Sequence, residues 1–250
     1  MRSLVILFFF LCLTLCGCED KKKTSEEKTE TPKEVVKDPV VSEIISDSTS
    51  KASAEGEVIK SQEFVYPKIT NENVVEFLTR YGKENPETKV RIITLHGNIE
   101  IKLYNDTPLH RANFIYLVKQ KYFNDTFFHR VVPNFIIQAG NSDTRDTPKK
   151  RSKLGKNYLI PAEFSNGRKH GRGTVSGAKE YRENPDKKSA PYEFFIFLGP
   201  LSSTGHLNGN YTIFGRVTKG MDVVETIANL ASDEGDWPLQ NVYITIDVMD

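Results

Sequence analysis

The chain has 250 residues, and its 34 lysines and arginines nearly balance 33 aspartates and glutamates, which gives a formal net charge of +1. This balance provides no overall field that would attract nucleic acid or acidic lipid, so we expect no nucleic-acid partner. The 38% hydrophobic and 27% charged fractions are those of a globular protein, and the length allows one domain with appendages or two small domains.

The N-terminus has the pattern of a targeting sequence. A basic start precedes residues 4–15, an almost wholly apolar stretch that is shorter than the about 20 residues needed to span a bilayer. The following Leu15-Cys16-Gly17-Cys18 resembles a bacterial lipoprotein signal. The resemblance implies a signal peptide over residues 1–17, lipidation of Cys18, and a lipid-anchored protein of the bacterial cell envelope whose domain lies outside the cytoplasm. An ordinary secretory peptide cut nearby is the alternative.

A polar segment follows over residues 18–62. It consists mainly of Lys, Glu, Thr, Ser and Asp and contains no aromatic residue. Such a composition cannot bury enough apolar surface to offset the entropy lost on ordering. A flexible chain of this length has an end-to-end distance on the order of 40 Å. We therefore predict a tether that holds a folded domain away from the membrane.

Residues 63–89 form a short helical segment before the main domain. Asn71 can cap a helix, apolar residues follow at helical spacing, and Gly82 can end it, so the pattern predicts a helix over residues 71–81. We expect its apolar side to pack on the following domain. Docking to a partner in an envelope assembly is the alternative.

From residue 90 the pattern changes to short strands with few helices. A turn at His96-Gly97-Asn98 predicts a hairpin, Thr107-Pro108 begins a helix that extends to about Gln120, and another helix is predicted near residues 221–228. The predicted strands cover residues 90–94, 99–104, 127–132, 135–139, 174–177, 194–198, 211–217 and 242–249. This content predicts a mainly β fold over residues 90–250, either a sandwich or a closed barrel.

The usual patterns of metal, cofactor and nucleophile sites do not occur. The five histidines include no pair at i, i+4 spacing and no cysteine neighbours at zinc-ligand spacing. Gly171-Arg172-Gly173 lacks the context of a dinucleotide loop, and Ser176 lacks the spacing of a nucleophile elbow. The many basic residues of 141–172 are not interleaved with aromatic ones, so they predict a solvated loop. We expect neither a metal nor a cofactor.

One run raises a physical question. Residues 127–140 read FFHRVVPNFIIQAG and look like barrel core, yet Arg130 stands among the apolar residues. A guanidinium keeps its charge and is poorly tolerated in such a setting unless it has a partner or a task. From the pattern alone, a structural ion pair and a functional role both remain open.

The same run resembles the signature strand pair of the cyclophilin family of peptidyl-prolyl cis-trans isomerases. Further blocks occur along the chain in the family's order. They are TPLHRANF before this run and IPAEF, GTVSGA, FFI, LNG and FGRV after it. The resemblance implies a closed eight-stranded antiparallel β-barrel that is capped by two α-helices and carries its site on an outer face. It also implies an enzyme that isomerises Xaa-Pro bonds in proline-containing polypeptide clients, here during the folding of exported proteins.

The resemblance assigns roles to positions that match the family motif. Arg130 matches the catalytic arginine, and Gln138 matches the glutamine that helps to hold this arginine and the substrate. The positions that would bind substrate are Phe135, Ile136, Ala178, Glu193, Phe195, His206, Leu207 and Tyr211. Three residues depart from the usual pattern: Asn141 replaces an acid, Glu193 a glutamine, and His206 the tryptophan of cyclosporin-binding members.

An arginine suits this chemistry. Rotation about a peptide bond is opposed by ~18–20 kcal/mol, because the nitrogen lone pair is conjugated with the carbonyl group. In the twisted state the prolyl nitrogen has a lone pair, to which Arg130 could donate a hydrogen bond that the planar states cannot accept.

Two rival functions stay open: a proline-peptide binding module with little turnover, which Glu193 would favour, and an envelope scaffold docked through the helix at 71–81.

Overall fold

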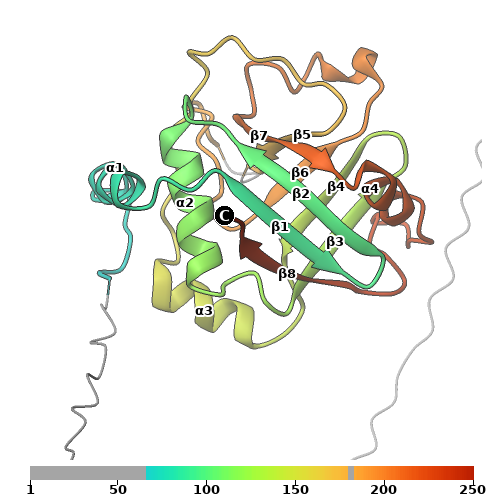
Figure 1. Ribbon diagram of the computed structural model, residues 1–250, viewed down its shortest axis with the longest axis horizontal. Helices are drawn as coiled ribbons and strands as arrows, with labels where there is room; N and C mark the ends of the chain where they lie inside the picture. The colour runs from blue at the N-terminus through green and yellow to red at the C-terminus, as the bar shows by residue number, and fades with distance from the viewer. Residues whose placement is uncertain (1–65, 180–182) are drawn as a thin grey trace, which may run out of the picture. The chain divides into compact units, whose positions relative to one another are not determined.

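The computed structural model of the protein describes residues 66–179 and 183–250 (Figure 1). The signal peptide predicted over residues 1–17, the lipidation of Cys18 and the tether predicted over residues 18–62 lie outside the described residues and stay predictions. The part of the chain that is described contains no helix long and apolar enough to cross a membrane.

Short antiparallel strands close into a barrel. In the described residues they are β1 (Lys89–Thr94), β2 (Gly97–Leu103), β3 (Thr126–Val132), β4 (Ile136–Asn141), β5 (Thr174–Gly177), β6 (Phe194–Phe197), β7 (Ile213–Lys219) and β8 (Val242–Val248). The hydrogen-bonded order around the barrel is β1, β2, β7, β5, β6, β4, β3, β8, and each neighbouring pair is antiparallel. The predicted closed eight-stranded barrel is confirmed.

The first hairpin shows how alternation in the sequence fills the barrel. Val90 and Ile92 of β1 pair with Ile101 and Ile99 of β2, and all four side chains are at most 1% exposed. Successive residues of a strand point to opposite faces, so every second side chain enters the interior. The apolar area removed from water by this packing stabilises the barrel.

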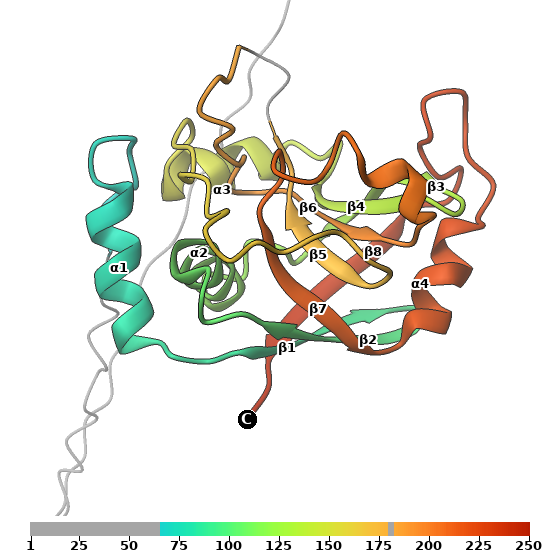
Figure 2. The same ribbon diagram turned by 90° about the horizontal axis from the view of Figure 1, so that it is seen from above.

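Two helices lie at opposite ends of the barrel, α2 (Pro108–Lys119) and α4 (Met221–Ala228) (Figure 2). Both were predicted. The first turn of α2 carries Pro108, which has no backbone N–H to satisfy. The carboxylate of Glu163 accepts hydrogen bonds from the backbone nitrogens of Leu109 and His110, each at 3.0 Å. This carboxylate therefore completes the N-terminus of α2.

The predicted N-terminal helix exists as α1 (Val74–Glu84), with shifted ends. Asn71 does not cap it, because its side chain bonds to the backbone of Asn157 and Leu159 instead. Gly82 does not end it either. A Cβ at Gly82 would come within 3.0 Å of the Cβ of Ala112 in α2, so glycine allows the two helices to approach closely. As expected, the apolar side of α1 is buried.

The prediction of a solvated loop over residues 141–172 was wrong in one part. The segment contains α3 (Asp146–Leu154), which lies outside the barrel (Figure 1). Only Thr147 and Leu154 of this helix are buried, so it carries no apolar stripe that periodicity could detect. Together with α1 and the two end helices, it gives four α-helices within the described residues.

Candidate active site

The outer surface of β4 and β6 carries an apolar cluster that is separate from the barrel interior. Ile137 and Ala139 of β4 belong to the interior core, whereas Ile136 lies outside it. In β6 the same alternation places Phe195 and Phe197 on the outside with Ile136 and Leu207. Alternate residues of β4 therefore belong to opposite sides of the barrel wall.

A cavity of about 280 Å³ lies over this outer cluster. Its lining consists of Arg130, Phe135, Ile136, Gln138, Ala178, Lys179, Phe195, His206, Leu207 and Tyr211. Every residue that the motif resemblance assigned to catalysis or substrate binding lines it, except Glu193. One further residue, Lys179, was not predicted. Residues that are far apart in the sequence thus meet in one apolar slot with a guanidinium at its edge.

Aromatic contacts shape the slot. The ring of Phe135 meets Phe197 edge-on at a centroid distance of 6.1 Å and lies 5.8 Å from the ring of His206. Phe195 meets Tyr211 edge-on at 5.4 Å. Such arrangements are favoured by the ring quadrupoles and hold the walls at fixed angles. The walls of the slot are therefore held by contacts within the protein.

His170 supports the slot from behind, and the sequence analysis did not assign it a role. Its ring stacks on Phe195 at an interplanar angle of 7°, and its nitrogens lie within hydrogen-bond distance of Asn208 and Ser176. Burial lowers the pKa of His170, although its hydrogen bond with Asn208 acts in the opposite direction. The neutral imidazole is thus favoured, as suits a packing residue.

The guanidinium of Arg130 is held by an aspartate. Its Nε donates to Oδ2 of Asp236 at 3.1 Å, and the two side chains are 34% and 40% exposed. The backbone nitrogen of Val131 donates to the Asp236 carbonyl at 2.8 Å, which fixes the loop that contains Asp236 to β3. Asp233 orders the loop further by accepting from the backbone nitrogens of Gly235 and Trp237.

Gln138 has a different partner from the one expected. The resemblance implied that it helps to hold the arginine, and the two residues are indeed paired across β3 and β4. The hydrogen bond of its side chain, however, runs from Nε2 to Oε2 of Glu193 at 3.0 Å. The structure therefore assigns the direct support of Arg130 to Asp236, and Gln138 is itself held by Glu193.

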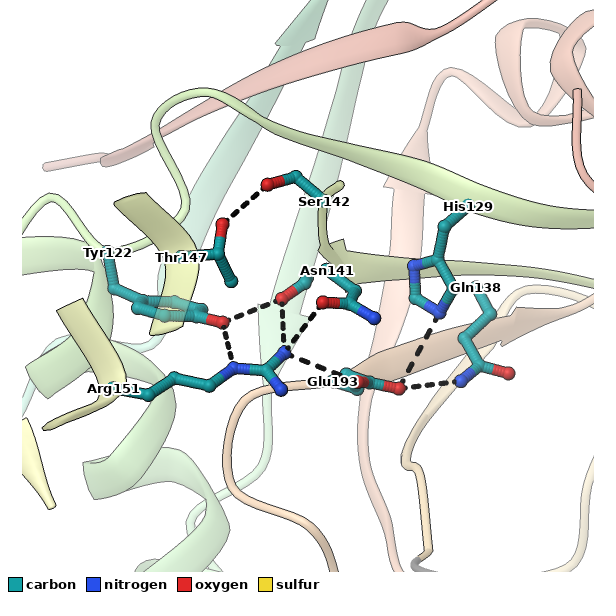
Figure 3. Close-up of polar contacts among 9 residues, drawn as sticks. Tyr122, His129, Gln138, Asn141, Ser142, Thr147, Arg151 and Glu193 are labelled. Atoms are coloured by element: carbon teal, nitrogen blue, oxygen red, sulfur yellow. Dashed lines mark hydrogen bonds and ion pairs between the residues drawn. The ribbon is translucent and has the colours of Figure 1, made fainter. Parts of the chain in front are cut away.

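Glu193 does not line the slot, contrary to its expected place among the substrate-binding residues. Its carboxylate turns toward Arg151 of α3, at 3.3 Å, and toward His129, at 3.5 Å (Figure 3). Burial alone would raise the pKa of Glu193, but hydrogen bonds from His129 and Gln138 and the charge of Arg151 lower it. The carboxylate is therefore charged and paired.

Arg151 connects this carboxylate to the end of β4. Its Nε donates to the hydroxyl of Tyr122 at 2.9 Å, and its Nη2 lies within hydrogen-bond distance of the Gly140 carbonyl and the Asn141 side chain (Figure 3). The Tyr122 hydroxyl also donates to Gly140. Asn141 and Glu193, two departures from the family pattern, thus share one arginine. The sequence analysis missed Arg151, because α3 was expected to be a loop.

A second hollow of about 380 Å³ adjoins the slot. Glu193 lines this hollow with His129, Trp237 and others, while Arg130, Gln138 and Lys179 line both spaces. These three residues therefore mark the boundary between the two spaces. In residues 66–179 and 183–250, no group of three or more His, Cys, Asp or Glu side chains is placed to hold a metal ion.

Comparisons with known proteins agree on one family. The family described as "Cyclophilin type peptidyl-prolyl cis-trans isomerase/CLD" matches residues 89–247. A peptidyl-prolyl cis-trans isomerase of Acinetobacter baylyi is 42% identical over 146 residues, which cover 57% of this chain and 73% of that protein.

Solved structures lead to the same family. The crystal structure of a cyclophilin type peptidyl-prolyl cis-trans isomerase of Cryptosporidium parvum aligns with a TM-score of 0.55 at 29% identity, covering 66% of this chain and 98% of that one. Its structure in the presence of the dipeptide Ala-Pro gives a TM-score of 0.53 at 29% identity, covering 65% and 99%. The chain therefore belongs to the cyclophilin family and is a peptidyl-prolyl cis-trans isomerase.

Proposed function

We propose that Arg130 is the catalytic group and acts on an Xaa-Pro bond whose proline ring occupies the slot beside it. The observation that carries this proposal is the cavity itself, in which an apolar slot and the guanidinium of Arg130 share one space. A related cyclophilin has been solved in the presence of Ala-Pro, a dipeptide of the same chemistry. Phe135, Phe195 and Leu207 grip the ring, and the acyl side of the bond turns.

The geometry leaves the terminal nitrogens of Arg130 available to a substrate. Among the described residues, the Arg130 side chain donates a hydrogen bond to Asp236, and it does so through Nε. Nη1 and Nη2 can therefore donate to the prolyl nitrogen when twisting frees its lone pair. Because this hydrogen bond does not exist in the planar states, it lowers the barrier to rotation about the Xaa-Pro bond and does not strengthen binding of the ground state.

The apolar walls increase the strength of this interaction. They exclude water from the reacting bond, so the hydrogen bond forms in a medium of lower dielectric constant than water. One preorganised donor of this kind contributes ~3 kcal/mol, or about a hundredfold in rate. Asp236 acts as a positioning residue, since it touches the guanidinium and not the substrate.

The cellular setting is the second part of the proposal. The lipoprotein-like sequence that ends at Cys18 and the polar residues 18–62 support an isomerase that is anchored by lipid in the bacterial cell envelope. With its domain outside the cytoplasm, the enzyme would assist the folding of exported proteins. If Cys18 carries the lipid, the protein from cells partitions into detergent and the Cys18→Ser variant does not. Equal partitioning would contradict the anchor.

Isomerisation kinetics test the catalytic part. The rate of cis-trans exchange of an Xaa-Pro peptide is measured with the wild-type chain and with Arg130→Ala. We expect kcat/KM to fall about a hundredfold while the circular dichroism spectrum is unchanged. A folded Arg130→Ala protein with wild-type kcat/KM would refute the assignment. A folded wild type that binds the peptide without speeding its exchange would instead support a binding module.

A further inference from the structure

Lys179 lies at the boundary between the slot and the adjoining hollow, and it lines both. It follows Ala178, whose backbone nitrogen donates to the Glu193 carbonyl and whose carbonyl accepts from the nitrogen of Ala190. The Nζ atom of Lys179 lies 4.5 Å from the centroid of the Tyr211 ring. A fixed backbone and a cation–π contact thus place a positive charge at the edge of the site.

The charged side chains of Arg130 and Glu193, which line the slot or the adjoining hollow, are neutralised in ion pairs. Arg130 is paired with Asp236 at 3.1 Å, and Glu193 is paired with Arg151 at 3.3 Å. Among the residues that the structure describes, no carboxylate forms an ion pair with Lys179. Within residues 66–179 and 183–250, the slot and the adjoining hollow therefore present the ammonium group of Lys179 without a paired carboxylate. Burial lowers the pKa of Lys179, and the positive charge of Lys187 adds to this effect. An incoming carboxylate would therefore offset the repulsion between these two lysines.

The direction of a bound peptide follows from the same geometry. When a proline ring fills the slot, its nitrogen lies near Arg130, which belongs to both spaces. The acyl residue Xaa is attached to that nitrogen and leaves the slot at this boundary. In this pose the side chain of Xaa can reach the adjoining hollow, which Lys179 also lines.

We propose that Lys179 makes the enzyme select Xaa-Pro segments in which Xaa is glutamate or aspartate. This inference rests on the proposed function, because it requires the proline ring in the slot and the prolyl nitrogen at Arg130. A partly exposed ion pair of this kind increases kcat/KM by about fivefold. It also weakens as salt screens the two charges.

The experiment uses the full chain and peptides that differ only at Xaa, which is Glu, Gln or Lys. Wild type is expected to isomerise Glu-Pro about fivefold faster than Gln-Pro in kcat/KM, and Lys-Pro more slowly than both. Lys179→Met is expected to lower the ratio of the Glu-Pro rate to the Gln-Pro rate from about fivefold to about one. Lys179→Glu is expected to reverse the order and favour Lys-Pro.

Lys153→Met is the matched control. Lys153 is an exposed residue of α3 that lines another hollow, and its replacement changes the net charge of the protein by the same amount. The preference for Glu-Pro should survive in this control. Equal Glu-Pro and Gln-Pro rates in wild type, or an unchanged preference in Lys179→Met, would overturn the inference and leave the role of Arg130 intact. If wild type accelerated none of the peptides, the proposed function would fail, and the inference with it.

Discussion

Arg111 and Arg130 both hold a guanidinium against the barrel, but their surroundings differ. Arg111 of α2 is 7% exposed, and its terminal nitrogens donate to backbone carbonyls, including those of Gly82 and Asn85, at 2.9 Å. These carbonyls belong to the last turn of α1 and the residue after it. Arg130 is one third exposed, bonds to one carboxylate through Nε, and borders a cavity.

The difference shows what each arginine contributes. The last carbonyls of a helix have no partner within the helix, so Arg111 satisfies groups that burial would otherwise leave unpaired. Its terminal nitrogens contribute to the fold. Arg130 borders an apolar slot, and under the proposed mechanism its terminal nitrogens donate to a ligand. The residue type is the same, and both the burial and the partners of the terminal nitrogens distinguish the two arginines.

Replacing each arginine by methionine gives the largest expected difference between the two. Arg111→Met leaves the carbonyls of Gly82 and Asn85 without donors, and we expect the free energy of unfolding to fall by about 3 kcal/mol. Its kcat/KM should stay within about twofold of wild type at temperatures where the protein is folded. Arg130→Met is the matched control, with a loss of less than about 1 kcal/mol. Urea unfolding measures both, and equal losses would show that the two arginines have the same structural role.

Asp236 provides a smaller effect, on the Arg130 side of the comparison. Asp236→Gly removes the acceptor of the Nε hydrogen bond without straining the backbone, which has φ 64° at this position. We expect kcat to fall about fivefold with KM nearly unchanged, because the guanidinium loses its fixed orientation. Asp236→Asn keeps an oxygen acceptor and tolerates the same φ, so it should recover most of the rate. If both variants matched wild type in kcat, Asp236 would not be a positioning residue.

Glu193 gives the smallest effect, which is visible as a dependence of stability on pH. Its pKa is lowered in the folded state relative to its ordinary value of 4.5. A carboxylate with a lowered pKa stabilises the fold above its unfolded pKa, and this contribution is lost as the pH falls through the folded pKa. The free energy of unfolding of wild type should therefore drop more steeply below about pH 4.5 than that of Glu193→Gln. Parallel urea-unfolding curves from pH 6 to pH 3 would show that Glu193 gains no stabilisation from His129 and Arg151.

The sequence was sufficient for the parts of the fold with a clear period. Alternation at residues 90–94 and 99–104 predicted β1 and β2, and Thr107-Pro108 located the start of α2. The motif resemblance identified the lining of the slot apart from Lys179, and it also included Glu193, which does not line the slot. Helix α3 was missed, because a segment with only two buried residues has no periodic apolar signal.

The partners within the site could not be predicted in the same way. Asp236 lies 106 residues after Arg130, and Glu193 lies 55 residues after Gln138. No local pattern connects such pairs, since only closure of the barrel and the return of the chain after α4 bring them together. Arg151 depends in addition on a helix that the sequence did not reveal. Lys179 has no motif match at all, and only the shape of the groove shows that it borders the site.

The most direct test of the central claim separates binding from turnover at Arg130. Two-dimensional NMR exchange on a bound Xaa-Pro peptide gives the cis-trans interconversion rate on the enzyme, and a titration gives the dissociation constant. The proposed mechanism has Arg130 act on a lone pair that exists only in the twisted state. It therefore predicts that Arg130→Ala slows the exchange about a hundredfold and changes the dissociation constant by less than about threefold. A dissociation constant that rises a hundredfold with an unchanged exchange rate would show that Arg130 binds the ground state and does not catalyse the rotation.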